Sequence, residues 1–218
     1  RLAMVPTLEP SDAQEALDFV KLGYELSEEF DTPVILRSTT RLSHTRSLVQ
    51  SGKRLTPKPL GFLEDPKKNV MIPGHSRLRH PKLLERESKL KAYFDSSDIN
   101  RWDKGSPDYG VITLGPPFTY VKEVLPEASV LKLGASYPLP EQRIREFCKS
   151  VKRVFVVEEL EPVVENEMRG MGLEVEGKKY FSRLGEFSPE TVRTGFEDAG
   201  IVQTKKKKVS VKIKPVVR

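Results

Sequence analysis

A guanidinium, a hydroxyl and an imidazole follow closely on one another at Arg41, Ser43 and His44, directly after a predicted strand at residues 34–39. Side chains at the carboxyl end of a strand lie where open α/β sheets bind their ligands. An arginine there can pair with a carboxylate, while a hydroxyl or an imidazole can donate a hydrogen bond to a carbonyl. We therefore interpret Arg41, Ser43 and His44 as candidate substrate-binding residues. The alternative, that this segment only pins one domain to the next, stays open.

Paired carboxylates occur at Glu158 and Glu159, after a predicted strand at residues 154–157. Such a pair can perform acid–base chemistry or hold a metal ion. No histidine lies nearby in sequence, and Glu161 is equally suited to a helix N-terminus, so a structural role is favoured. The sequence assigns no catalytic, cofactor-binding or metal-binding residue.

A Gly-Pro-Pro turn at residues 115–117 follows one predicted strand and opens a helix. Free N–H groups at such a place can hold an anion. Two prolines remove two of these donors, so we favour a rigid turn over a phosphate site.

The single cysteine, Cys148, excludes an intramolecular disulfide and leaves too few thiolates for an iron–sulfur cluster or a structural zinc site. It falls on the expected apolar face of a helix. We expect a buried structural thiol rather than a reactive one.

The net charge of +6 is concentrated at one end of the chain. Residues 204–218 contain seven Lys and Arg residues and no acidic residue, which leaves a net charge of −1 on residues 1–203. This tail has no aromatic residue, so we favour a solvated linker over a phosphate-binding arm.

A strand–helix–strand pattern in the first 40 residues positions the Arg41 cluster. It consists of a strand at residues 2–8, a helix at about residues 12–30 with Ser11 and Gln14 as a capping box, and a buried strand at residues 34–39. One such unit cannot form a sheet with both faces covered. We therefore expect further strands before Arg1 and a fragment of a longer protein.

The rest of the chain divides into a linker and a second α/β region. Residues 46–78 have linker composition, with residues 70–72 as a possible short strand, and a connecting helix is expected at residues 80–94 with Pro81 in its first turn. The second region has predicted strands at residues 109–114, 128–133, 154–157 and 173–175, and helices at residues 118–125, 141–150, 162–171 and from 189, capped by Ser188. This alternation predicts an α/β fold with a mainly parallel sheet. No apolar run is long enough for a membrane span, and we expect a cytoplasmic protein.

Six segments in order along the chain carry a family resemblance: residues 5–12, 33–44 (Pro-Val-Ile-Leu-Arg-Ser-Thr-Thr-Arg-Leu-Ser-His), 80–85, 131–140 (Leu-Lys-Leu-Gly-Ala-Ser-Tyr-Pro-Leu-Pro), 156–162 and 185–190. Together they resemble the alpha subunit of indolepyruvate ferredoxin oxidoreductase, in the 2-oxoacid:ferredoxin oxidoreductase family. The resemblance implies that residues 1–45 end a thiamine-diphosphate pyrimidine-binding domain, and that residues 46–107 form a linker with a connecting helix. Residues 108–203 would form a transketolase C-terminal-like domain, and residues 204–218 a basic linker tail.

The resemblance also implies an activity: oxidative decarboxylation of aryl-2-oxoacids such as indolepyruvate to acyl-CoA, with ferredoxin as electron acceptor. The implied partners are a beta subunit, ferredoxin, the oxoacid and coenzyme A. The full-length subunit would hold thiamine diphosphate, magnesium and [4Fe-4S] clusters through parts expected outside this chain, so this fragment would hold none of them and be inactive alone. The proline-rich turn at residues 115–117 departs from the family pattern, and the lysine run is not required by it.

Two other functions remain open from the residues alone. The chain can be a non-catalytic α/β module for subunit association. Less favoured is a nucleic-acid-binding protein that uses its lysine tail.

Overall fold

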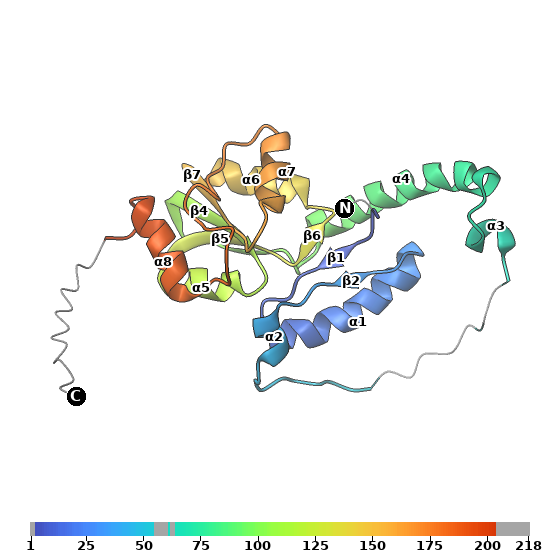
Figure 1. The fold of residues 1–218 in the computed structure, drawn as a ribbon, viewed down its shortest axis with the longest axis horizontal. Coiled ribbons are helices and arrows are strands. Elements are labelled where there is room, and N and C mark those ends of the chain that lie inside the picture. The colour runs from blue at the N-terminus through green and yellow to red at the C-terminus, as the bar shows by residue number, and fades with distance from the viewer. Residues whose placement is uncertain (1–2, 55–60, 62–63, 204–218) are drawn as a thin grey trace, which may run out of the picture.

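The computed structural model describes residues 3–54, 61 and 64–203, which form an α/β fold with two small sheets (Figure 1). The strand orders are β2-β1-β6 and β3-β5-β4-β7. Strand β1 pairs parallel with β2, and β4 pairs parallel with both β5 and β7. Strand β3 pairs antiparallel with β5, and β6 pairs antiparallel with β1. The predicted α/β class is therefore confirmed. Among the described helices, none combines the length and apolar character needed to cross a membrane. The lysine tail lies outside the described residues.

The first sheet is built around a short βαβ unit. Its elements are β1 (Thr7–Leu8), α1 (Ala13–Phe30), β2 (Ile35–Leu36) and the short helix α2 (Thr40–His44). The strand predicted at residues 34–39 was expected to be buried, and this is wrong: Ile35 and Leu36 are 49% and 37% exposed. The reason is that β2 lies at the edge of its sheet.

The start of α1 also differs from the prediction. Asp12, not Ser11, is the N-cap, and its Oδ1 accepts from the Glu15 N–H at 2.8 Å. The Ser11 N–H and hydroxyl both donate to Glu15 Oε2, at 2.8 and 2.7 Å. The predicted capping box of Ser11 and Gln14 is wrong because the Glu15 carboxylate engages the serine.

The segment between the sheets contains α3 (Pro66–Asn69) and the long helix α4 (Pro73–Ser96). No strand forms at residues 70–72, and the connecting helix begins well before residue 80, so both predictions are wrong. Pro73 opens the helix, where its missing N–H costs nothing. Pro81 then lies inside the helix, on an exposed stretch where water can solvate the carbonyl that loses its partner.

The rest of the chain, which forms the second sheet, its helices and the third strand of the first sheet, follows the predicted order closely. The elements are β3 (Arg101–Asp103), β4 (Ser106–Leu114), α5 (Pro117–Val124), β5 (Ala128–Leu133), β6 (Ala135–Tyr137), α6 (Glu141–Ser150), β7 (Arg153–Val157), α7 (Val163–Gly170) and α8 (Pro189–Asp198). Ser188 caps α8, as predicted, and forms a capping box with Thr191. The strand expected at residues 173–175 is reduced to one bridge between Phe155 and Glu176. The strands β3 and β6 were not predicted.

Helices cover both faces of the second sheet. Successive residues of β4 point to opposite faces, so Val111 packs with the cluster of α5 and α8, and Ile112 with that of α6 and α7. All four side chains of β7 from Val154 to Val157 are buried in the same alternation. The parallel strands are therefore buried on both faces, which explains their continuous apolar sequence.

A buried ion pair joins α1 to the second sheet. Lys132 on β5 is 1% exposed, and its Nζ lies 2.5 Å from Glu15 Oε2 and 4.8 Å from the centre of the Phe19 ring. Burial lowers the pKa of Lys132, although Glu15 opposes the shift. Burial alone would raise the pKa of Glu15, but Lys132 and the Ser11 hydrogen bonds together lower it.

The connection from β5 to β6 carries the chain from one sheet into the other. The Gly134 N–H donates to Asn100 Oδ1 at 2.9 Å, and the Gly134 carbonyl accepts from the Glu9 N–H at 2.8 Å. A Cβ at this position would lie 2.5 Å from the Ile99 carbonyl oxygen, so the close approach requires glycine. Asn100 is fully buried and also donates to the Phe94 carbonyl. Backbone contacts therefore fix β6 beside β1.

The ion pair predicts unequal effects of removing its two members. Glu15→Ala leaves a buried ammonium without a counter-charge and should lower the free energy of unfolding by about 3–5 kcal/mol. Lys132→Met should cost less, because Glu15 keeps both Ser11 hydrogen bonds and is 23% exposed. Urea unfolding followed by Trp102 fluorescence measures both, with the double variant as control. Equal losses, or a loss of less than about 1 kcal/mol for Glu15→Ala, would contradict this account.

Cys148 gives a second test of the packing. It is half-buried on α6 against the apolar cluster beneath that helix, and burial raises the pKa of its thiol to about 11. At pH 8 only about one thiol in a thousand is then ionised, so iodoacetamide should react at least about 100-fold more slowly than with an ordinary cysteine. Intact mass over time measures the rate, with the urea-unfolded chain as the fast control. Equal rates in the two states would show that the thiol is accessible and unperturbed.

Candidate functional site

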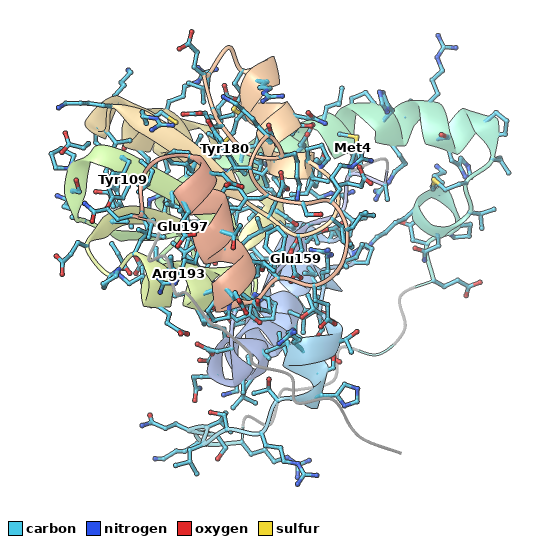
Figure 2. The ribbon with its side chains drawn as sticks, turned by 60° about the vertical axis from the view of Figure 1, so that its left-hand side comes forward. Met4, Tyr109, Glu159, Tyr180, Arg193 and Glu197 are labelled. Atoms are coloured by element: carbon cyan, nitrogen blue, oxygen red, sulfur yellow. The ribbon has the colours of Figure 1, made fainter. Side chains whose placement is uncertain are left out.

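A cavity of about 410 Å³ lies where the two sheets meet. Residues at or just beyond the carboxyl ends of β1, β2, β4 and β7 form much of its wall. Its lining includes Thr7, Glu9, Arg37, Thr39, Gly115, Pro116, Ser136, Tyr137, Glu158, Glu159 and Glu161. Figure 2 labels Glu159, which lies near the end of α8 that is closest to the first sheet. Open α/β sheets bind ligands at this edge, so the cavity is the candidate site.

An ion pair that the sequence analysis missed forms one wall. Arg37 Nη1 lies 2.5 Å from Glu9 Oε2; the Glu9 side chain is 7% exposed and that of Arg37 is 41% exposed. Each residue directly follows a strand, Glu9 after β1 and Arg37 after β2. Because β1 and β2 are parallel neighbours, their carboxyl ends meet, and this spacing was the available signal. The buried carboxylate holds the guanidinium at the cavity while compensating its charge.

The carboxylate pair after β7 has a structural role. Glu158 accepts from the N–H groups of Val163, Val164 and Glu165, at 3.1, 2.9 and 3.0 Å, and so caps α7. Burial raises the pKa of Glu158, although these three hydrogen bonds oppose the shift. Glu159 Oε1 accepts from the Phe187 N–H at 2.8 Å and anchors the loop before α8. The favoured structural interpretation is confirmed.

The Gly-Pro-Pro turn offers no anion cradle. Gly115 adopts φ 60°, a left-handed conformation that favours glycine. The next N–H groups, those of Phe118 and Thr119, are bound to the carbonyls of Gly115 and Pro116 at 3.1 and 3.0 Å. A rigid turn was the favoured interpretation and is confirmed.

The predicted substrate-binding residues lie on α2, beside the cavity rather than in its lining. Arg41 Nε donates to Glu186 Oε2 at 2.9 Å, and the pair is about half exposed. Hydrogen bonding to Glu186, with a further contribution from Tyr120, raises the pKa of Arg41. Ser43 Oγ lies 2.8 Å from Ser38 Oγ, and His44 is exposed. The Arg41–Glu186 pair links α2 to the loop before α8.

The residues present do not fit the metal-containing groups that the family resemblance implies. A [4Fe-4S] cluster requires four cysteine thiolates, and the sequence has one. Within the described residues, no group of three or more His, Cys, Asp and Glu side chains is arranged to hold a metal ion. We therefore derive no chemical step through a cluster or a metal ion in this chain.

Comparison with known proteins identifies subunits that are similar in sequence to this chain. It is 42% identical over 209 residues to the indolepyruvate oxidoreductase subunit IorA of Archaeoglobus fulgidus, covering 91% of this chain and 33% of that subunit. It is 41% identical over 191 residues to the IorA subunit of Methanothermobacter thermautotrophicus, covering 82% of this chain and 31% of that subunit. No protein-family model matches the chain.

A solved structure shares the fold. The 2-oxoglutarate:ferredoxin oxidoreductase of Magnetococcus marinus superposes with a TM-score of 0.64 at 16% identity, covering 88% of this chain and 42% of that chain. At this identity the likeness concerns the fold alone. The chain spans about a third of the length of the IorA subunits. Over that span, the expected resemblance to the alpha subunit of indolepyruvate ferredoxin oxidoreductase is confirmed.

Proposed function

We propose that this chain is part of an oxidoreductase subunit that oxidatively decarboxylates aryl-2-oxoacids, such as indolepyruvate, to acyl-CoA with ferredoxin as electron acceptor. The observation that carries the proposal is the 42% identity to an IorA subunit across 91% of the chain. The substrate is taken from the name of these relatives. On this proposal the enzyme is cytoplasmic.

The proposed role of the chain is to build the frame and part of the rim of the oxoacid pocket. Arg41 would pair with the substrate carboxylate, while Ser43 and His44 would hold the α2 loop or donate to the carbonyl. The exposed pair with Glu186 is compatible with this role, because water screens a salt bridge between solvent-exposed side chains and leaves it contributing little. A substrate carboxylate can therefore exchange with Glu186. Arg37 would provide a second guanidinium at the same edge, held by Glu9.

Partners and cofactors belong to the proposal at the level of the whole enzyme. They are a beta subunit, ferredoxin and coenzyme A, with thiamine diphosphate, magnesium and [4Fe-4S] clusters held elsewhere in the full-length subunit. The domain division at residues 45, 107 and 203 is also part of the proposal. In the structure β6, from within residues 108–203, pairs with β1. The two proposed domains therefore share a sheet.

A non-catalytic subunit-association module is the second candidate. For Arg41 it implies a structural role, since its pair with Glu186 links α2 to the loop before α8. Nucleic-acid binding through the lysine tail is a weaker third candidate, and the tail lies outside the described residues.

Kinetics of two matched variants separate the first two candidates. In the full-length subunit assembled with its partner, Arg41→Ala should lower kcat/KM for the oxoacid about 10- to 150-fold, because a charge-assisted hydrogen bond is lost. Glu186→Gln removes the same ion pair but keeps the guanidinium, so it should leave kcat/KM unchanged or higher. If both variants fail to assemble, the role of Arg41 is structural: its pair with Glu186 holds α2 against the loop before α8. An unchanged kcat/KM in assembled Arg41→Ala removes it from the site.

The isolated 218-residue chain should hold no iron–sulfur cluster and bind no thiamine diphosphate with micromolar affinity. The single cysteine cannot ligate a cluster, and no metal-binding group stands among the described residues. Iron analysis, visible absorption and titration calorimetry with thiamine diphosphate and magnesium test this, with the full-length subunit as positive control. Micromolar binding of thiamine diphosphate by the isolated chain would contradict the proposal that this cofactor is held elsewhere in the full-length subunit.

A further inference from the structure

The first half of α4 stands away from the body of the molecule. In Figure 1 this end of the helix extends past α1 and carries α3 at its tip. No residue from Pro66 to Lys89 is buried, and the first buried side chains of the helix are Leu90 and Phe94. We call residues 64–86 the arm. Its helical part lacks the core contacts that normally stabilise a helix.

A single aspartate fastens the arm to α1. Asp31 is the C-cap of α1; its carboxylate lies 2.6 Å from Lys68 Nζ and 3.7 Å from Arg79 Nη2. Its carbonyl accepts from Arg86 Nη1 at 2.8 Å. These contacts are exposed and each contributes little. A helix of this length that contains Gly74 and Pro81 is marginal in water, so the arm gains most from a surface that covers it.

The arm combines exposed apolar side chains with positive charge. Val70, Met71 and Ile72 are 50–54% exposed, and Leu78 is 72% exposed. Residues 64–86 contain six Lys and Arg residues and three acidic residues, a net charge of +3, and two of the basic residues, Lys68 and Arg79, pair with Asp31. This is a local departure from residues 1–203, whose overall net charge is −1. Contiguous exposed apolar residues of this kind are typical of an interaction surface.

The distribution of the apolar side chains favours a protein partner over a lipid surface. Leu78 and Leu84 lie six residues apart, which places them about 120° apart around the helix axis. A flat bilayer accepts only one face of a helix, whereas a protein groove can enclose several. The arm also has no Phe, Tyr or Trp side chain to stack on bases.

We propose that the arm is a docking element for a second subunit, whose surface offers an apolar groove bordered by carboxylates. The matched relatives are themselves named as subunits, so a second polypeptide is expected in their assemblies. The identity of this partner as the second subunit of the oxidoreductase rests on the proposed function. The arm's geometry and charge do not depend on it.

Hydrogen exchange and binding test the proposal in the full-length subunit and its partner. Backbone amides of residues 70–86 should exchange about tenfold or more slowly in the complex than in the subunit alone. Leu78→Asp should raise the Kd about tenfold or more, whereas Leu48→Asp, at a fully exposed position outside the arm, should change it less than about twofold. Leu78→Gln, which keeps a good helix former, should weaken binding in the same direction. Circular dichroism checks that each variant is folded.

Several outcomes overturn the proposal. In hydrogen exchange, these are equal exchange rates of the arm in the free and the bound subunit, or full protection of the arm in the subunit alone. In binding, they are a failure of the two subunits to associate, or equal effects of Leu78→Asp and Leu48→Asp on the Kd. Turnover is a separate readout. A complex that oxidises the oxoacid with an unprotected arm rejects only the docking role. A protected arm in a complex without oxoacid turnover rejects only the proposed function.

Discussion

The buried contact between Lys132 and Glu15 is the constraint on which the relative placement of the two sheets depends. A lysine that is 1% exposed on a central strand requires a counter-charge, and Glu15 on α1 supplies it at 2.5 Å. Glu15 in turn holds Ser11, so the charge pair fixes the first turn of the helix. Beside this pair β1 lies against β6, where the Glu9 N–H donates to the Gly134 carbonyl and fixes the same placement. The cavity wall at Glu9 and Arg37 follows from that placement.

The charged side chains at this edge of the sheets have partners within the protein. The carboxylates at this edge are compensated locally: Glu9 by Arg37, Glu158 by three N–H groups and Glu161 by Arg183. The buried carboxylates of Glu9 and Glu158 therefore have structural roles. The Arg41–Glu186 pair is exposed and held less tightly, and on our proposal it is the contact that a carboxylate ligand would exchange with. This division between a fixed frame and an exchangeable rim is what links the fold to the proposed handling of an oxoacid.

Long periodic elements were predictable from the sequence, whereas features set by distant contacts were not. The bounds of β5 and α6 match the prediction because a short, mostly apolar run and an amphipathic ten-residue helix are strong local signals. The strands β3 and β6 have three residues each and form only because β5 and β1 lie beside them. Ser11 has the local chemistry of a cap, but the Glu15 carboxylate recruited by Lys132 takes its hydroxyl. The position of the candidate site at the strand ends was predictable. The partner of Arg41, Glu186, lies 145 residues away and had no local signal.

The central claim is that this frame serves the oxidation of an aryl-2-oxoacid. The most direct measurement is coenzyme A-dependent ferredoxin reduction by the full-length subunit assembled with its partner, comparing indolepyruvate with 2-oxoglutarate as substrates. The account predicts turnover of both or of indolepyruvate alone, with the higher kcat/KM for indolepyruvate. Absence of reduction with either oxoacid in an assembly that carries its cofactors, or a clear preference for 2-oxoglutarate, would contradict it.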